Sequence, residues 1–276
     1  MKLVYLGTPE MAVPPLRALV DAGHEVVRVI TRVDKKRGRG GAVSPSPVKA
    51  AAVELGLVVS HDPDDVVDAV EAGAELGVVV AYGRIIKPHL LDVVPMINLH
   101  YSLLPRWRGA APVERAILAG DAETGVDVMR VEEGLDTGGI YAEERVPIGD
   151  DTTADELRAE LTEVGCRLLV DTLARPLTEW IDHPRPQAGD TVYAAKLEKA
   201  EFEIDWDRPA VEIRRLVRVG GAWTTFRGKR LKILAADVVD GALVPSVVQP
   251  EGKGPMDFDA WRNGARPQSD ELFGER

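Results

Sequence analysis

The sequence predicts an α/β fold: a Rossmann-like, open, mostly parallel sheet with helices on both faces, followed by a small, mostly β C-terminal domain. Two observations predict it. Short apolar and β-branched runs alternate with helical patterns as far as residue 176, which implies parallel strands joined by right-handed crossovers. The composition then changes at H-P-R-P-Q-A-G-D (183–190), after which short strands separated by glycine turns predominate.

A β-α-β unit opens the chain. Lys2–Leu6 is an apolar strand that Gly7-Thr8-Pro9 interrupts, and a helical pattern then runs from Met11 to Ala22. Glu25–Thr31 is a second, β-branched strand, which we expect to lie parallel to the first. The turn between strand and helix lacks the G-x-G-x-x-G pattern, so a dinucleotide is not indicated.

The same alternation continues to residue 176. Arg32–Ser46 is predicted to be a loop rich in glycine and basic residues, and Ser46-Pro47 supplies the N-cap and first residue of a helix that ends at Leu55. Thr152-x-x-Asp155 resembles a capping box and predicts a long helix that ends near Pro176. The elements expected between these points are strands at 57–60, 76–81, 96–100, 125–131 and 141–147, the last at an edge, and helices at 62–72, 88–93 and 111–119.

The change in composition also predicts the domain organisation. We expect a larger domain at 1–188, a linker at 189–203 and a small β-rich domain at 204–276. The polar end of the chain, 268–276, is expected to be frayed. The elements predicted in the small domain are a helix at 209–219 and strands at 223–226, 230–235 and 242–248.

Composition excludes several classes of protein. The chain has 276 residues, of which 45% are apolar and 29% charged, so we expect a sizeable core and a soluble protein. No apolar run reaches the roughly 18–20 residues that span a bilayer, and the start lacks the features of a secretory signal. The single cysteine excludes an internal disulfide, and no His, Asp or Glu set has metal-ligand spacing. We therefore expect a cytoplasmic monomer with no metal and no membrane contact.

The distribution of charge indicates a local anionic partner. The net charge of −11 argues against a protein that coats nucleic acid by bulk attraction. Basic residues nevertheless gather in two places, and although a solvated face would explain either alone, two clusters on an acidic chain favour an anionic ligand. The first cluster holds Lys35, Lys36, Arg37 and Arg39, and the second holds Arg214, Arg215, Arg218, Arg227, Lys229, Arg230 and Lys232.

Two polar segments are the candidates for chemistry. Asn98 and His100 lie two residues apart in I-N-L-H-Y-S-L-L-P-R-W-R-G-A-A-P (97–112), so they share one face of a strand. The carboxyl end of a strand in an open parallel sheet is where ligands bind. Asp136 lies in E-G-L-D-T-G-G (133–139), after the next strand, and is expected at the same edge. The three side chains can therefore converge.

An Asn, a His and an Asp suit transfer of an acyl group to an amine. The attack forms a tetrahedral oxyanion, to which an Asn amide can donate a hydrogen bond commonly worth roughly 3–4 kcal/mol. A His can donate to the same oxygen or handle the proton, and a carboxylate can fix the imidazole tautomer and take the proton. Direct transfer needs no Ser or Cys nucleophile, and a turn hydrogen bond is the favoured role of nearby Ser102. Asn98 and His100 alone would also fit a polar strand end with satisfied hydrogen bonds.

Several motifs carry a resemblance to a known family. They are G-T-P-E-M-A-V-P (7–14), G-R-G…P-S-P-V-K (38–49), A-Y-G-R-I-I-K-P (81–88), S-L-L-P-R-W-R-G-A-A-P (102–112) and E-E-G-L-D-T-G (132–138), with weaker matches at I-D-W, G-K-R-L-K-I and V-Q-P-E-G-K. Through them nearly the whole chain resembles the folate-dependent formyltransferases. Asn-x-His with Asp marks this family as a whole. The W-R-G-A-A-P and P-S-P-V-K motifs favour the branch of this family that acts on methionyl-initiator tRNA.

The resemblance implies a formyl donor, 10-formyltetrahydrofolate, as co-substrate without a metal. It implies Asn98, His100 and Asp136 as the catalytic set. The residues that it implies for folate binding are Tyr82, Gly83, Arg84, Ile85, Ser102, Leu103, Leu104, Pro105, Gly134, Leu135 and Thr137. The residues assigned to tRNA binding are Lys35, Lys36, Arg37, Arg39, Arg214, Arg215, Arg218, Lys229, Arg230 and Lys232. The small C-terminal domain would hold the acceptor arm through phosphate contacts, which position without reading sequence.

Three departures from the family pattern keep alternatives open. Gly41-Ala42 stand where two more basic residues are usual, Arg84 stands at the expected folate mouth, and the C-terminal domain is short by several strands. Related enzymes that formylate amino-sugar nucleotides have different tails, so that acceptor is the main alternative. A hydrolase with water as acceptor would need neither basic cluster. A folate- or RNA-binding protein without catalysis would not need Asn98, His100 and Asp136.

Overall fold

The structure, a computed structural model, describes residues 1–37, 42–268, 271 and 273–274. It divides into two compact units. Unit 1 holds residues 1–112, 123–147 and 158–194, and unit 2 holds 113–122, 148–157 and 195–276. Arg39, expected to bind tRNA, lies outside the described residues, and the boundaries 1–188, 189–203 and 204–276 stay a prediction.

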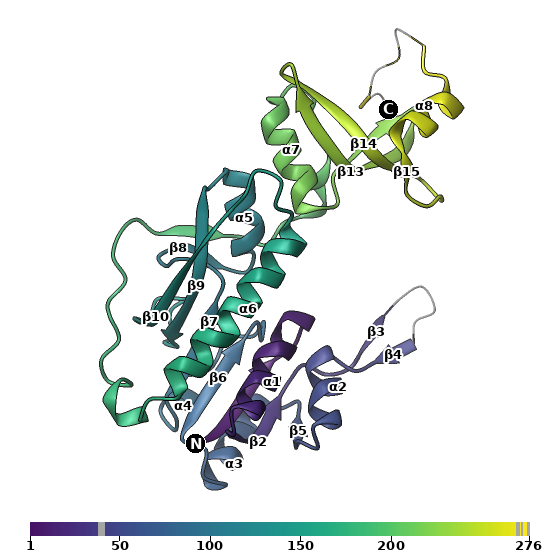
Figure 1. Cartoon of the computed structure of the whole chain (residues 1–276). Coiled ribbons are helices and arrows are strands. Elements are labelled where there is room, and N and C mark those ends of the chain that lie inside the picture. The colour runs from purple at the N-terminus through teal and green to yellow at the C-terminus, as the bar shows by residue number, and fades with distance from the viewer. Residues whose placement is uncertain (38–41, 269–270, 272, 275–276) are drawn as a thin grey trace. The chain divides into compact units, whose positions relative to one another are not determined.

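A seven-stranded sheet in the order β10-β9-β7-β6-β1-β2-β5 forms the centre of unit 1 (Figure 1). Its strands are β1 (Lys2–Gly7), β2 (Glu25–Ile30), β5 (Val59–Ser60), β6 (Leu76–Val80), β7 (Met96–His100), β9 (Glu123–Arg130) and β10 (Ile140–Pro147). The first five run parallel, and β9 lies antiparallel between β7 and β10. The mostly parallel Rossmann-like sheet is therefore confirmed, with β10 at the predicted edge.

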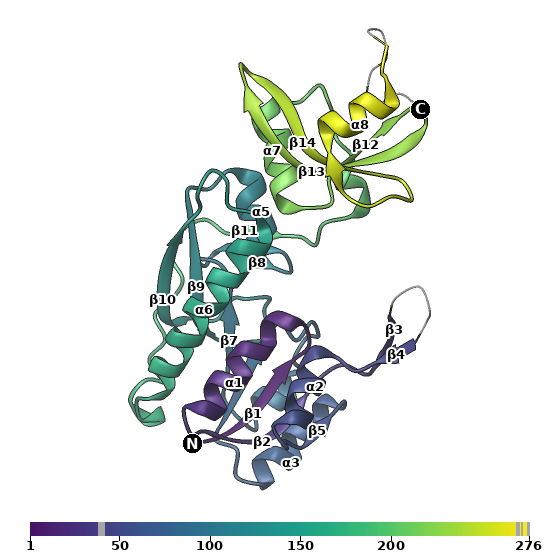
Figure 2. The same ribbon diagram turned by 45° about the vertical axis from the view of Figure 1, so that its right-hand side comes forward.

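Helices cover both faces of this sheet (Figures 1 and 2). The helical segments of unit 1 are η1 (Glu10–Ala12), α1 (Val13–Asp21), α2 (Pro47–Glu54), η2 (Pro63–Asp65), α3 (Val66–Glu71), α4 (Pro88–Leu91) and η3 (Leu177–Glu179), and α6 (Ala154–Leu173) begins in unit 2. On one face, Val66 of α3 and Leu90 of α4 join a buried cluster with Val79 and Met96. On the other face, α6 packs closely on Leu99 of β7, because a Cβ at Gly165 would lie 3.0 Å from the Leu99 side chain. Two-sided burial explains the almost wholly apolar central strands.

Helix caps decide where two of these helices begin. Ser46 accepts a hydrogen bond from the Lys49 backbone N–H at 3.0 Å, and Pro47 starts α2, as predicted. The capping box of α6 was predicted one residue too early. Thr153 and Glu156 form it, because the Glu156 carboxylate accepts from the Thr153 N–H while the Thr153 hydroxyl accepts from the Glu156 N–H.

Two segments predicted to be irregular contain strands. Lys35–Arg37 forms β3, which pairs antiparallel with β4 (Ala42–Ser44) inside the predicted loop at 32–46. β11 (Val192–Ala194), inside the predicted linker, pairs parallel with β8 (Arg106–Gly109) of the W-R-G segment. Neither strand shows the alternation of a half-buried strand, which is why the sequence pattern missed both.

Unit 2 contains a four-stranded antiparallel sheet packed on a helix (Figure 2). Its elements are α5 (Pro112–Ala119), η4 (Lys199–Phe202), α7 (Ala210–Val219), β12 (Trp223–Phe226), β13 (Lys229–Val239), β14 (Ala242–Pro250), β15 (Met256–Asp257) and α8 (Phe258–Ala265). Ile213 and Leu216 of α7 pack against Leu231, Ile233 and Val248 of the sheet. The mostly β character is confirmed, whereas β15 and α8 were not predicted.

The described residues include no helix that is long and apolar enough to cross a membrane.

Candidate active site

His100 is held at the carboxyl end of β7 by two groups on opposite sides of its ring. Its Nε2 lies 3.0 Å from the Trp107 carbonyl oxygen, and because a carbonyl only accepts, Nε2 carries a hydrogen and donates it. Its Nδ1 lies 3.8 Å from Oδ2 of Asp136. The side chain is buried. The Trp107 carbonyl therefore fixes the Nε2–H form, a role that the sequence reasoning gave to a carboxylate.

Asp136 reaches His100 by a different route from the one predicted. β9 runs antiparallel to β7, with Ile97 opposite Arg130, so the segment after β9 leaves the sheet at the amino end of β7. Residues 131–139 must therefore run back along the sheet toward His100. Asp136 has a left-handed backbone (φ +50°), and its Oδ2 accepts a 2.8 Å hydrogen bond from the Gly109 N–H. The convergence is observed, but the carboxyl-end argument for it was wrong.

Asn98 shares its sheet face with His100 because the two are separated by one residue of β7. Its side chain is half-buried, and its amide makes no hydrogen bond to any other residue that the structure describes. Its donors are therefore not used by the described residues, and the side chain lies on the sheet face that also carries the imidazole. The arrangement therefore leaves Asn98 able to donate to a ligand beside His100.

The segment after β7 folds into a tight turn that brings the Trp107 carbonyl and the Gly109 amide to the site. The Ser102 hydroxyl donates to the Arg106 carbonyl at 2.7 Å, the turn role that the sequence favoured. The Leu104 N–H donates to Oδ2 of Asp127 at 2.8 Å. Trp107 and Gly109 both have positive φ (+66° and +121°), so the turn is sharp.

Asp127 is a buried carboxyl group near the site that sequence reasoning missed. It lies on β9 directly opposite His100, and its Oδ1 has no hydrogen-bond partner among the described residues. Burial raises its pKa to about 7; the Leu104 N–H lowers it, Glu143 raises it, and Arg185 and Arg145 lower it. An Asp inside the otherwise apolar strand segment G-V-D-V-M was the signal that could have revealed it.

Asp127→Asn is expected to remove a pH dependence of folding stability. The folded pKa of about 7 lies above the ordinary 3.8, so the folded chain binds the proton more tightly. The contribution of Asp127 to the free energy of unfolding is then greatest below pH 4 and falls as pH rises to about 7, by an amount on the order of 4 kcal/mol. Urea unfolding at several pH values between 4 and 8 measures it. Asp92→Asn, at an exposed position, is the control and should keep the slope, whereas a slope that survives in Asp127→Asn would contradict the prediction.

Comparisons with known proteins identify the family of the chain. Residues 1–173 match the family described as Formyl transferase, and residues 196–242 match the family described as Formyl transferase, C-terminal domain. A methionyl-tRNA formyltransferase from Symbiobacterium thermophilum is 45% identical, over 97% of this chain and 94% of that protein. Another from Dinoroseobacter shibae is 48% identical, over 88% of this chain and 84% of that protein. The chain belongs to the methionyl-tRNA formyltransferase family.

Solved structures with low sequence identity share the formyltransferase fold. Methionyl-tRNA formyltransferase from Clostridium thermocellum has a TM-score of 0.60 at 15% identity, covering 92% of this chain and all of that one. HypX from Aquifex aeolicus in complex with tetrahydrofolic acid has a TM-score of 0.66 at 16% identity, covering all of this chain and 51% of that one. At such identities the likeness establishes the fold alone.

The residues expected to bind folate divide into two groups in this formyltransferase. In the loops after β6 and β9, Gly83, Arg84, Gly134 and Thr137 are exposed, and Ile85 and Leu135 are 85% and 58% exposed although they are large and apolar. Tyr82 is buried in the cluster that contains Val79. Ser102, Leu104 and Pro105 are buried and Leu103 is half-buried against Gly125, so these four can offer a ligand little beyond backbone groups.

The residues expected to bind tRNA also fall into groups with different surroundings. Two of the arginines are bonded to other residues of the protein. Arg214 donates to the Asp150 and Ala236 carbonyls and pairs with Asp151 and Asp237. Arg218 donates to the carbonyls of Thr152 and Gly149, at 2.9 and 2.8 Å.

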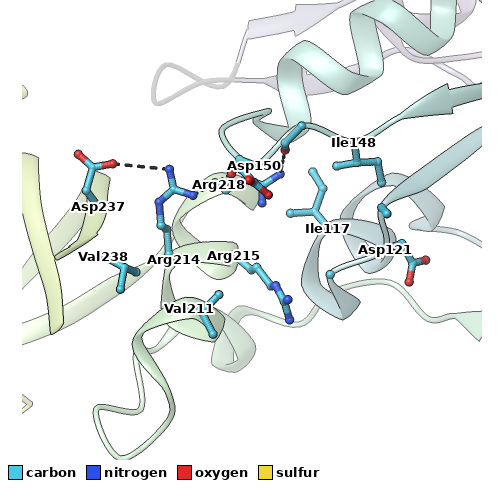
Figure 3. Close-up of a pocket in the computed structure, with 13 residues that line it drawn as sticks. Ile117, Asp121, Ile148, Asp150, Val211, Arg214, Arg215, Arg218, Asp237 and Val238 are labelled. Atoms are coloured by element: carbon cyan, nitrogen blue, oxygen red, sulfur yellow. Dashed lines mark hydrogen bonds and ion pairs between the residues drawn. The ribbon is translucent and has the colours of Figure 1, made fainter. Parts of the chain in front are cut away.

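These contacts border a pocket of about 500 Å³ within unit 2 (Figure 3). Arg215 also borders it and lies against Gly120. None of Asn98, His100 and Asp136 lines this pocket.

Three other basic residues stand on the sheet surface of unit 2. Lys229, Arg230 and Lys232 are exposed on β13, and none of them has an acidic partner among the described residues. The Arg230 guanidinium lies 3.9 Å from the ring centre of Trp223 on the neighbouring strand. This half of the predicted cluster is thus available to a ligand. Lys35, Lys36 and Arg37 lie on β3, and their side chains are outside the described part of the chain.

Proposed function

We propose that the chain transfers a formyl group from 10-formyltetrahydrofolate to the amino group of methionyl-initiator tRNA, acting in the cytoplasm. One observation carries the proposal: His100 lies between the Trp107 carbonyl and the Asp136 carboxylate, and on the same sheet face lies the Asn98 amide, which bonds to none of the residues that the structure describes. These groups can stabilise an oxyanion and accept a proton. Such chemistry is what direct transfer of an acyl group to an amine requires.

Asn98 and His100 are the proposed oxyanion donors. As the amine nitrogen attacks the formyl carbon, the carbonyl oxygen gains negative charge. The free Asn98 amide can donate to that oxygen, and so can Nδ1 of His100 when it carries a proton. Nε2 is not available for this step, because it donates to the Trp107 carbonyl. Donors fixed before the reaction stabilise the developing charge without reorganisation, which is the source of their effect.

Asp136 is the proposed proton acceptor and the partner that orients His100. The attacking amine must lose a proton as its bond to carbon forms, and the Asp136 carboxylate, whose Oδ2 lies 3.8 Å from Nδ1 of His100, is the base beside the imidazole that would take it, directly or through one water. The Gly109 N–H fixes one carboxylate oxygen at 2.8 Å. When the bond between the formyl carbon and its donor nitrogen breaks, that nitrogen takes up the proton held by Asp136 and leaves as the neutral amine of tetrahydrofolate, while the tetrahedral oxygen returns to a carbonyl. Because the amine attacks the formyl carbon directly, no covalent enzyme intermediate forms.

The loops at 82–85 and 134–137 are the proposed folate contacts. They supply exposed backbone groups and two exposed apolar side chains, Ile85 and Leu135, which suit a flat ring system with polar edges. The backbone of 102–105 is the remaining proposed contact.

A formyl-transfer assay tests the proposed function. The purified chain would receive 10-formyltetrahydrofolate with methionyl-initiator tRNA in one reaction and with an amino-sugar nucleotide in another. Formyl-methionyl-tRNA is the expected product. Turnover of the sugar nucleotide without formylation of the tRNA would assign the rival acceptor. Release of formate when neither acceptor is present would indicate a hydrolase.

Neutralising the exposed basic residues is expected to weaken tRNA binding and reduce its salt dependence. Each basic side chain that neutralises a phosphate of a duplex adds about 0.9 to the slope of log K against log salt, so replacing Lys229, Arg230 and Lys232 together by Gln should reduce the slope by up to about 3. Fluorescence titration with tRNA at several salt concentrations measures this slope.

The double variant Arg214→Gln, Arg218→Gln is compared with this triple variant, because the guanidinium groups of Arg214 and Arg218 already donate hydrogen bonds within unit 2. We expect this pair to lower the melting temperature and to change the salt slope less. Folate binding should be unchanged in both variants. An unaltered slope in the triple variant would count against a role for β13 in tRNA binding.

A further inference from the structure

We infer that Gln187, in the proline-rich segment at 183–194, is a positioning residue that fixes the loop carrying Asp136. The inference deepens the proposed function and rests on it. It joins two sequence features that the proposed chemistry leaves unexplained: Arg108 of the W-R-G motif and the H-P-R-P-Q-A-G-D segment (183–190), where the composition changes just before the predicted linker. All of the contacts that support it lie within unit 1.

The Gln187 amide connects three groups around the site. Its Nε2 donates to the carbonyl oxygens of Asp136 and Gly138, each at 2.8 Å. Its Oε1 accepts from Nε and Nη2 of Arg108, at 3.1 and 2.6 Å. A primary amide has two donor hydrogens at one end and an acceptor at the other, so these contacts use both functions of the side chain. Gln187 is also half-buried between exposed Pro186 and Ala188.

The backbone on either side of Gln187 is anchored to the same two site segments. Arg185 and Ile140 exchange backbone hydrogen bonds of 2.8 Å, next to the end of the Asp136 loop. Further along, the Ala194 carbonyl accepts from the Ala110 and Ala111 N–H groups at 2.9 and 3.2 Å, where β11 pairs with β8. The segment therefore spans from the loop that holds Asp136 to the turn that presents Trp107 and Gly109.

The Asp136 loop depends on such hydrogen bonds because it has little other support. Residues 132–135 and Thr137 are exposed, so few apolar contacts fix their conformation. Asp136 itself holds a left-handed φ of +50°, which a non-glycine residue keeps only when its surroundings impose it. The two carbonyl groups bound by Gln187 flank Thr137, one of them on Asp136, and so fix the direction of the peptide that carries the carboxylate.

Kinetics of Gln187 variants test the inference. Gln187→Met keeps the length of the side chain and removes all of its hydrogen bonds, so we expect kcat for formyl transfer to fall about 10–100-fold through misplacement of Asp136. The KM for methionyl-tRNA should not change. Gln187→Glu keeps an acceptor for Arg108 but loses both donors, and it should show a similar loss of kcat. Gln249→Met removes a comparable amide hydrogen bond, to the Lys253 carbonyl in unit 2, and should leave kcat unaltered.

A double variant separates positioning from general stability. In an Asp136→Asn background the carboxylate is already absent, so Gln187→Met should cause little further loss of kcat. A full further loss there, or an unchanged kcat in Gln187→Met or Gln187→Glu, would overturn the inference. If Gln187→Met does not fold, Gln187→Glu decides, since it keeps the Arg108 contact. Absence of formyl transfer by the unaltered chain would instead be a failure of the proposed function.

Discussion

Asp136→Asn is expected to lower kcat for formyl transfer by about 10²–10⁴-fold, the usual contribution of a positioned proton acceptor. Asn has nearly the same shape and tolerates the left-handed backbone that Asp136 adopts, and its side-chain oxygen can still accept from the Gly109 N–H. It cannot accept a proton from the amine, and it carries no charge to face Nδ1 of His100. Single-turnover rates with saturating donor and methionyl-tRNA measure the effect on chemistry alone.

Asp240→Asn is the matched control for this experiment. Asp240 also has a φ of +50°, in the hairpin turn between β13 and β14 of unit 2, so the same substitution is made in the same backbone conformation but outside the unit that holds His100. Both variants should keep the melting temperature of the unaltered chain. A rate for Asp136→Asn equal to that of Asp240→Asn would show that the carboxylate is not the proton acceptor.

Gly138→Ala is expected to damage both stability and activity. A Cβ at this position would lie well inside contact distance of the Arg130 carbonyl oxygen, which is fixed backbone and cannot move aside as a flexible side chain could. Overpacking of this kind costs about 1–3 kcal/mol or more. The loop that relieves it carries Asp136 two residues earlier, so kcat should fall together with the free energy of unfolding.

Urea unfolding and steady-state kinetics check this result, with Gly254→Ala as the control. Gly254 has open space where a Cβ would be placed and no positive φ, so its substitution should change neither measurement. A shift in the urea midpoint at unchanged m-value for Gly138→Ala is the expected sign of strain in the native state. Gly138→Ala that unfolds at the urea midpoint of the unaltered chain would contradict the expected clash.

Much of unit 1 was predictable because its elements carry strong local signals. β7 was predicted with its observed bounds, and α2 was predicted to begin at Pro47 because Ser46-Pro47 is a cap pattern. Elements held mainly by partners were missed: β11 exists through its pairing with β8, and α8 packs through Trp261 against Phe226, which is distant in sequence. Pairing and packing at such separations leave no periodic trace in the local sequence.

The sequence by itself determined that Asn98 and His100 share a face at the end of a strand, because side chains alternate along any strand. Through its motifs it also indicated the family to which the chain belongs.

Only the tertiary structure decided how Asp136 meets His100, since the antiparallel direction of β9 depends on pairing with β7 and not on local residues. It alone showed that the Trp107 carbonyl binds Nε2, and that Oδ1 of buried Asp127 has no hydrogen-bond partner in the described part of the chain. It likewise separated Arg214 and Arg218, which bind carbonyl groups of their own unit, from exposed Arg230, because hydrogen-bond partners are chosen by the fold.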